Sequence, residues 1–157
     1  VCSRIGIEAD AVTFMATDDL FAITERIHEQ SPLHCVLVDE AQFLTKIQVQ
    51  QLTQICDLHD IPVMTFGLRT DFLGNLFEGS QHLLAWADSL KEIKTICHCG
   101  RKATMVLRID SEGLVMKAGD QVQIGGNEKY LSVCRKHFNA GMSERDDDSF
   151  PAIGEDA

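Results

Sequence analysis

Along the first half of the chain, short runs of apolar residues alternate with stretches in which apolar residues recur every three or four positions. The runs predict strands and the longer period predicts helices. The predicted strands are residues 11–14, 34–38 and 63–66, and the predicted helices are residues 20–30, 45–60 and 80–86. The run at 34–38 does not alternate with polar residues, so we expect both of its faces to be covered, as in a parallel sheet between helices. This order of elements predicts an α/β fold.

Local signals mark where the first two helices begin and end. Thr17-Asp18-Asp19 offers an N-cap and an acidic first turn for the first helix. Ser31-Pro32 ends that helix, because the residue before a proline avoids helical backbone angles. Thr45 can cap the second helix. We expect four of its residues to face the core: Val49, Leu52, Ile55 and Cys56.

The pattern changes after about residue 88. Shorter-period apolar positions predict strands at residues 90–96, 103–109 and 121–124, with a turn at 110–113. The glycine-containing segment 67–79 is long enough to form a flap over a site. We therefore predict an α/β domain over residues 1–90, a small β-rich domain over residues 91–140 that needs a staple, and an acidic tail over residues 141–157 with little order.

Composition narrows the class of protein. The chain of 157 residues is 45% apolar and 24% charged, and its 24 acidic and 14 basic residues give a net charge of −10. An acidic chain is a poor binder of nucleic acid, because phosphate contacts need clustered basic residues, and Arg101-Lys102 and Arg135-Lys136 are small pairs. No apolar run approaches the ~20 residues of a membrane span and no secretory signal opens the sequence. We expect a cytoplasmic protein without membrane or nucleic-acid partners.

Two short clusters of cysteine and histidine predict a metal site. Cys97-His98-Cys99 and Cys134-Arg135-Lys136-His137 together offer three thiolates and an imidazole, the closed tetrahedral shell of a structural zinc. Four protein ligands leave no open position for a catalytic water. The alternative is two unrelated groups of reduced thiols. We expect His98 to point to solvent. The remaining cysteines are expected to be reduced and to bind no metal: Cys2, Cys35 and Cys56.

Two carboxylates end the second predicted strand. Asp39 and Glu40 follow Val36-Leu37-Val38, and ligands of open α/β sheets sit at the carboxyl ends of the strands. An apolar strand ending in Asp-Glu resembles a Walker B element, whose Asp holds Mg²⁺ and whose Glu can accept a proton. The matching phosphate loop, G-x-x-x-x-G-K-[ST], is absent from the sequence, because Gly74 and Gly79 have its spacing but no lysine follows.

Five motifs taken together are similar to the type II thymidine kinase family. They are Val38-Asp39-Glu40-Ala41-Gln42-Phe43, Gly67-Leu68-Arg69-Thr70-Asp71-Phe72, Cys97-His98-Cys99, Ile124-Gly125-Gly126-Asn127-Glu128-Lys129-Tyr130 and Cys134-Arg135-Lys136-His137. The resemblance spans residues 3–138. It implies a P-loop/RecA-like parallel sheet flanked by helices, and a zinc-binding domain with a loop called the lasso. It also implies a salvage enzyme that transfers the ATP γ-phosphoryl group to the 5′-hydroxyl of thymidine, with Mg²⁺.

The resemblance also implies residue roles. Glu40 matches the family's general base, and Asp39, with Ala41 and Gln42, borders ATP and magnesium. Phe43, Leu68 and Phe72 match positions that wall the nucleoside base, and Tyr130 matches a residue near the sugar. The lasso residues that grip the base are Gln121, Val122, Gln123, Ile124 and Gly125. The implied structural zinc ligands are Cys97, Cys99, Cys134 and His137. Relatives tend to be homotetramers, and dTTP is a possible feedback inhibitor.

The departure from the family pattern is the phosphate loop, since the sequence begins at Val1 within the stretch that follows it. We therefore expect these residues alone to be inactive without that loop, which cradles the phosphates of ATP. A second reading is a non-catalytic nucleoside- or partner-binding zinc module that lacks the ATP site. A third, a zinc-ribbon nucleic-acid binder, has the wrong surface charge.

Overall fold

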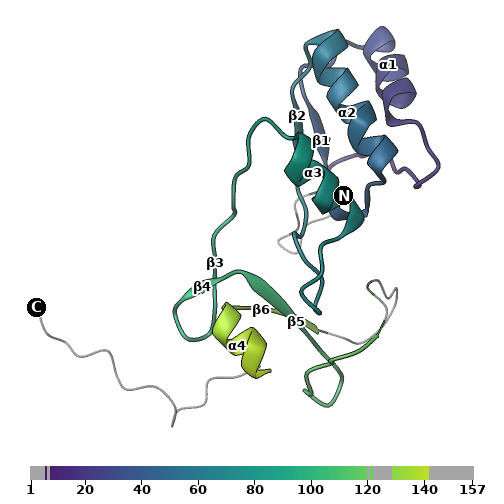
Figure 1. Cartoon of the computed structure of the whole chain (residues 1–157). Coiled ribbons are helices and arrows are strands. Elements are labelled where there is room, and N and C mark those ends of the chain that lie inside the picture. The colour runs from purple at the N-terminus through teal and green to yellow at the C-terminus, as the bar shows by residue number, and fades with distance from the viewer. Residues whose placement is uncertain (1–5, 7, 120, 122–128, 142–157) are drawn as a thin grey trace, which may run out of the picture. The chain divides into compact units, whose positions relative to one another are not determined.

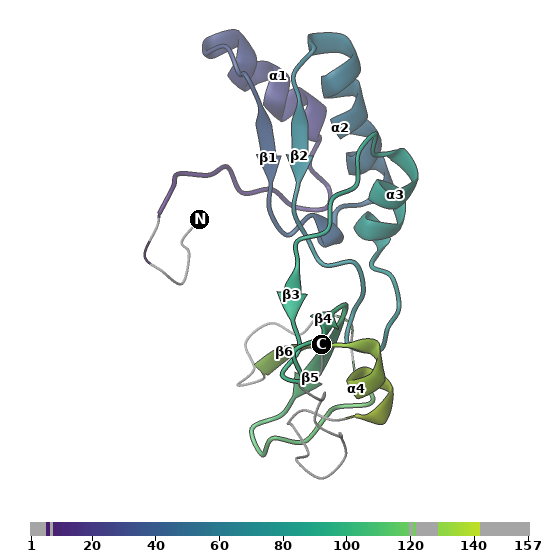
Figure 2. The ribbon, with the colours of Figure 1, turned by 90° about the vertical axis from the view of Figure 1, so that its left-hand side faces the viewer.

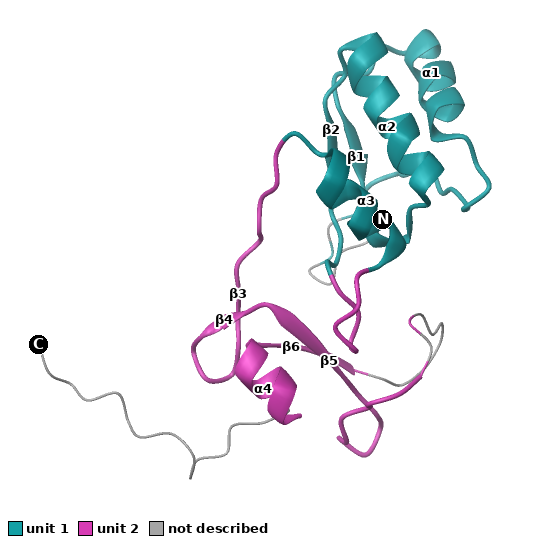
Figure 3. Ribbon diagram, in the orientation of Figure 1, with its two compact units in different colours: residues 1–69, 77–88 teal, residues 70–76, 89–157 magenta. Residues whose placement is uncertain are grey.

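The computed structural model describes residues 6, 8–119, 121 and 129–141, and the chain divides into two compact units (Figures 1 and 3). Unit 1 comprises residues 1–69 and 77–88, and unit 2 comprises residues 70–76 and 89–157. Each unit has its own cluster of buried apolar side chains. Among the described residues, the helices are too short and too polar to cross a membrane.

Unit 1 is a small α/β arrangement built on two parallel strands. Its elements are α1 (Leu20–Gln30), β1 (Val36–Val38), the 3₁₀ turn η1 (Ala41–Phe43), α2 (Lys46–His59), β2 (Val63–Thr65) and α3 (Glu78–Trp86). Figure 2 shows β1 and β2 side by side, with Val36 paired to Val63 and Val38 to Thr65. Helix α2 connects the two strands, as parallel pairing requires a crossover. The predicted α/β class is confirmed at this level.

The helix starts predicted from the sequence are confirmed by their caps. The Asp19 carboxylate accepts a hydrogen bond from the Ala22 N–H at 3.0 Å, which satisfies one exposed donor at the start of α1. At α2, the Thr45 hydroxyl accepts from the Gln48 N–H, and the Gln48 side chain accepts from the Thr45 N–H. This reciprocal capping box fixes the first turn of α2.

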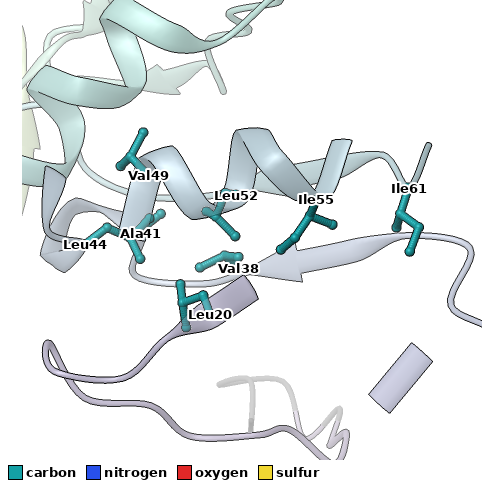
Figure 4. Close-up of a cluster of buried hydrophobic side chains, with 8 residues drawn as sticks. All are labelled: Leu20, Val38, Ala41, Leu44, Val49, Leu52, Ile55 and Ile61. Atoms are coloured by element: carbon teal, nitrogen blue, oxygen red, sulfur yellow. The ribbon is translucent and has the colours of Figure 1, made fainter. Parts of the chain in front are cut away.

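The core of unit 1 gathers around the end of β1. Figure 4 shows Val38 of β1 between Leu20 of α1 and the inner face of α2. The buried cluster consists of Leu20, Val38, Ala41, Leu44, Val49, Leu52, Ile55 and Ile61. Cys56, which was expected in this core, is only half-buried. The side chains of α2 therefore hold β1 in place at the residue that precedes the two carboxylates.

Two predictions for this unit are wrong. Residues 11–14 form no strand, and the Val12 side chain is 61% exposed. Leu37 and Met64, which are register partners on β1 and β2, are 65% and 50% exposed, so one face of the strand pair is not covered as expected. An apolar run predicts a buried strand only when other elements are available to pair with it and pack on it.

Unit 2 consists of short antiparallel pairs and one helix. Its elements are β3 (Thr95–Ile96), β4 (Lys102–Ala103), β5 (Met105–Ile109), β6 (Lys129–Val133) and α4 (Arg135–Ala140). β3 pairs with β4, and β5 pairs with β6. The turn predicted at residues 110–113 is confirmed, whereas the strand predicted at 90–96 is limited to its last two residues. The sequence analysis missed β6 and α4.

Two glycines of unit 1 allow close packing around η1. A Cβ at Gly79 would overlap the Ala41 carbonyl oxygen and lie 2.8 Å from the Gln42 carbonyl oxygen. A Cβ at Gly67 would lie 2.5 Å from the Gln42 Oε1 atom and 2.9 Å from the Gln42 backbone nitrogen. Both positions therefore require the absence of a side chain, because backbone atoms cannot move aside cheaply.

We predict that Gly79→Ala destabilises the protein by about 1–2 kcal/mol, because overlap with the η1 backbone outweighs the ~1 kcal/mol that alanine gains in a helix. Urea denaturation followed by circular dichroism measures the change. Gln81→Ala, at an exposed position of the same helix, is the control and should change stability by less than ~0.5 kcal/mol. A Gly79→Ala variant as stable as the parent would contradict the packing argument.

Candidate active site and metal centre

Asp39 and Glu40 lie at the carboxyl end of β1, both exposed. One Asp39 carboxylate oxygen accepts a hydrogen bond from the Glu40 N–H at 2.9 Å. Glu40 has φ 50° and ψ 36°, a left-handed conformation that costs a non-glycine residue about 1–2 kcal/mol. Such outliers persist where surrounding structure enforces them, and they cluster at functional sites.

The backbone around Glu40 is fixed by strand β2. The Phe66 N–H donates to the Val38 carbonyl at 2.8 Å, and the Ala41 N–H donates to the Phe66 carbonyl at 2.8 Å. Ala41 is fully buried, so the chain cannot relax outward after Glu40. The two carboxylates therefore occupy a rigid turn at a strand end, a geometry suited to binding a cation and accepting a proton.

Gln42 connects Glu40 to the segment after β2. Its side chain is only 2% exposed. The Gln42 Nε2 donates to the Glu40 Oε2 at 2.5 Å, and its Oε1 accepts from the Leu68 N–H at 3.1 Å. Unit 1 thus brings Glu40, Gln42 and Leu68 together through one side chain.

Phe43 and Leu68 both present apolar surface on unit 1. Phe43 is 48% exposed and meets the Phe77 ring edge to face, with centroids 5.7 Å apart. Leu68 is 45% exposed, and its carbonyl accepts a hydrogen bond from the Ser80 hydroxyl at 2.6 Å. These contacts hold an exposed aromatic ring and an exposed leucine in fixed positions.

Phe72 belongs to unit 2 and is buried. The fully buried Arg108 of β5 places its guanidinium 5.0 Å from the centre of the Phe72 ring, a cation–π contact. Next to it, Asp71 accepts hydrogen bonds from the Leu73 and Asn75 N–H groups, at 2.9 and 2.8 Å. The loop that presents Phe72 is therefore built on a buried carboxylate and a buried cation.

Asp71 also binds the start of the predicted lasso. Its second carboxylate oxygen accepts from the Gln121 Nε2 at 2.9 Å, across fifty residues of sequence. The other predicted lasso residues lie outside the described part of the chain: Val122, Gln123, Ile124 and Gly125. Tyr130 lies on β6, pairs with Arg108 and is 54% exposed. The sequence analysis missed Asp71 and Arg108, although an arginine inside the apolar run 105–109 is a signal for a buried charge.

Four predicted metal ligands come together in unit 2. Cys97 and Cys99 lie in the β3–β4 turn, Cys134 is the N-cap of α4, and His137 lies one turn into α4. Their ligand atoms all lie within 4.8 Å of one another. The Cys97 Sγ is 3.2 Å from the His137 Nδ1, and the Cys99 and Cys134 Sγ atoms are 3.9 Å apart. The alternative of two unrelated thiol groups does not fit this arrangement.

The donor set suits a tetrahedral metal ion. With metal–sulfur bonds of about 2.3 Å, such an ion holds two sulfurs about 3.8 Å apart, close to the distance between Cys99 and Cys134. The β3–β4 turn is closed by hydrogen bonds from the Cys97 N–H to the Arg101 carbonyl and from the Gly100 N–H to the Cys97 carbonyl, both 2.8 Å. Gly100 has φ 80°, the left-handed conformation that this tight turn needs.

The two facing thiols of this cluster are electrostatically unequal. Burial raises the pKa of the Cys99 thiol, and hydrogen bonding and charge repulsion from Cys134 raise it further. Burial acts in the same direction on Cys134, but the His137 N–H at the start of α4 and hydrogen bonds from Cys99 and Cys97 outweigh it and lower the Cys134 pKa.

The expectation that His98 points to solvent is wrong. The His98 ring stacks on the His137 ring, with centroids 4.3 Å apart and planes 10° apart. The His98 Nε2 is buried and has no hydrogen-bond partner among the described residues. Stacking on a predicted ligand ring holds His98 against the cluster, a contact that sequence spacing alone does not reveal.

Known proteins with similar sequences identify the family of this chain. A family model described as thymidine kinase matches residues 1–138. The thymidine kinase of Rhodopirellula baltica is 60% identical over 153 residues, which cover 98% of this chain and 72% of that protein. The thymidine kinase of Vibrio cholerae is 59% identical over 142 residues, 90% of this chain and 74% of that protein. The thymidine kinase of Shewanella oneidensis is 64% identical over 138 residues, 88% and 72% respectively.

We predict that Asp71→Ala destabilises the protein by about 2–3 kcal/mol, because three donors lose a buried charged acceptor. Asp110→Ala is a matched control, since Asp110 accepts the same kind of local hydrogen bonds from the Glu112 and Leu114 N–H groups. It should cost only about 1 kcal/mol, because those bonds are exposed. Equal losses in urea denaturation would contradict the argument that burial and the bond to Gln121 make Asp71 the more stabilising acceptor.

Proposed function

Because the chain belongs to the thymidine kinase family, we propose that it transfers the γ-phosphoryl group of ATP to the 5′-hydroxyl of thymidine. The observation that carries the proposal is the rigid Asp39–Glu40 pair at the end of β1, within a family match that covers residues 1–138. Phosphoryl transfer needs little covalent help from a protein, and positioning and charge neutralisation supply most of the catalysis.

Glu40 is the proposed general base. Its exposed carboxylate is available to accept the proton of the 5′-hydroxyl as the new phosphate ester bond forms. Asp39, also exposed, would hold Mg²⁺, which neutralises phosphate charge when bound. The segment of Asp39, Glu40, Ala41 and Gln42 is proposed to border the phosphates of ATP.

The nucleoside would be held by apolar walls and by backbone groups. The exposed surfaces of Phe43 and Leu68 support a role as walls for the base, and the cation–π contact under Phe72 supports a fixed ring at that position. The proposed base-gripping loop runs from Gln121 to Gly125, and the exposed Tyr130 is proposed to lie near the sugar. Backbone donors and acceptors suit a pyrimidine edge because the fold fixes their geometry.

The β1–α2–β2 unit supports the proposed P-loop/RecA-like architecture, since such sheets are built from parallel strands joined by helices. A homotetramer and feedback inhibition by dTTP remain predictions from the resemblance. Neither the site geometry nor the relatives favour the non-catalytic alternative, because the matched proteins are named as kinases.

Cys97, Cys99, Cys134 and His137 are the proposed ligands of a structural zinc. Three thiols and an imidazole form the donor set that zinc prefers, and four protein ligands complete a tetrahedral shell. Bound zinc would join the β3–β4 turn to α4 and so hold unit 2 together.

We predict that, in the protein with the phosphate loop restored upstream, Glu40→Gln lowers kcat for thymidine by about 10²–10⁴-fold, because the proton acceptor of the reaction is lost while the shape of the side chain is kept. The KM for thymidine should change little, since the base and sugar contacts remain. A coupled ADP-release assay measures both constants. The control is Asp57→Asn, an exposed carboxylate on α2, which should turn over like the parent. Full activity in Glu40→Gln would remove the assigned role.

Elemental analysis should find one zinc ion per chain in the purified protein, because the described residues offer one complete ligand set. Cys99→Ser and His137→Ala should lose the metal, whereas Cys56→Ser, which alters a cysteine of unit 1, should retain it. Zinc release should increase as the pH falls, since protons compete with the metal for thiolates and imidazole. Retention of zinc by both ligand variants would refute the site.

A further inference from the structure

Gln42 is a buried residue whose side chain donates a hydrogen bond to the proposed general base, Glu40. Its amide is 2% exposed and is used at both ends, by the Glu40 carboxylate on one side and the Leu68 N–H on the other. Both ends of the Gln42 amide are therefore engaged within the protein.

The orientation of the amide is fixed by chemistry. The Leu68 N–H is a donor and can meet only the carbonyl oxygen of the amide. The NH₂ group must then face Glu40, where it donates to Oε2 at 2.5 Å. If the amide were flipped, its NH₂ group would face the Leu68 N–H, and its oxygen would face the Glu40 carboxylate oxygen. Neither pair can form a hydrogen bond, so the Leu68 N–H determines that the NH₂ group reaches the carboxylate.

Neighbouring residues keep the amide from moving. Gly67 lies directly against it, since a Cβ there would be 2.5 Å from the Gln42 Oε1. Gln42 is the middle residue of the 3₁₀ turn η1, and a Cβ at Gly79 would lie 2.8 Å from its carbonyl oxygen. The amide is thus held between the Leu68 N–H and the Glu40 carboxylate, with Gly67 against its oxygen.

We propose that Gln42 is a positioning residue, which holds one oxygen of the Glu40 carboxylate so that the other faces the hydroxyl to be deprotonated. The proposal rests on the assignment of Glu40 as general base in the proposed kinase reaction. A hydrogen bond to a carboxylate is stronger than one between neutral groups, and it fixes the plane of a side chain that is otherwise exposed to water. Misplacing a reacting group by about 1 Å can cost ~10²-fold in rate.

Two variants separate the two ends of the amide. Gln42→Glu keeps an acceptor for the Leu68 N–H but replaces the donor to Glu40 with a second carboxylate, and Gln42→Met keeps the volume but removes both hydrogen bonds. We expect both to lower kcat about 10–100-fold, with the KM for thymidine within about threefold of the parent. Gly67→Ala, which pushes on the unaltered amide, should lower kcat in the same direction.

Gln48→Met is the matched control for the loss of a buried glutamine. Gln48 is 1% exposed, and its Nε2 donates to the Met15 and Asp18 carbonyls, away from Glu40. This variant should be less stable than the parent but should keep its kcat at a temperature where it is folded. A parental kcat in Gln42→Met, or an equal loss in Gln48→Met, would overturn the proposal.

Amide NMR tests the same contact without turnover. The Gln42 side-chain NH₂ should exchange with solvent at least ~10-fold more slowly than that of Gln54, which is exposed on α2, and Glu40→Ala should accelerate it. Equal exchange of Gln42 and Gln54 would overturn the proposal. Slow exchange in a protein that carries the phosphate loop and still does not phosphorylate thymidine would instead refute the proposed function and leave the Gln42–Glu40 contact in place.

Discussion

The turn that follows β1 is the constraint on which the candidate active site depends. The chain must leave the strand at Val38, meet the backbone of Phe66 and pass beneath α3 within a few residues. Ala41 is completely buried in this turn, and Gly67 and Gly79 leave no space beside it. Within this turn Glu40 adopts a left-handed backbone, with φ 50°. The position of the carboxylate is therefore set by packing and backbone hydrogen bonds.

Unit 2 is stabilised differently, because its strands are too short to enclose a large apolar core. Its buried cluster consists of Cys97, Ala103, Leu107, Val133 and Cys134. Two of the five residues are also predicted metal ligands, so the same side chains serve as core and as donors. In a domain with this little apolar burial, metal–ligand bonds can replace hydrophobic stabilisation. Arg108 and Asp71 are also buried in this unit. Each has contacts that offset the cost of burying a charge: Arg108 lies over the Phe72 ring, and Asp71 accepts hydrogen bonds from backbone N–H groups.

Local signals made parts of this structure predictable. The capping pair Thr45 and Gln48, which marks the start of α2, lies within four consecutive residues. The two cysteine-histidine clusters are short motifs whose side chains are known metal donors. The strand at residues 11–14 was wrongly predicted because an apolar run does not reveal whether a pairing partner exists. Asp71 was missed because its role depends on Gln121, fifty residues away. The stacking of His98 on His137 likewise exists only after the metal ligands have come together.

Gln42 and Gln48 show why an amide suits a buried connecting position in this fold. Both are almost fully buried in unit 1, and each carries a donor and an acceptor at the end of one neutral side chain. A lysine or glutamate in either niche would bring a charge that burial penalises. At position 42 a charged side chain would also attract or repel the Glu40 carboxylate, which already lies next to the carboxylate of Asp39. A neutral donor therefore orients the carboxylate and leaves the charge of the acid pair unchanged for the cation and the phosphate that it is proposed to meet.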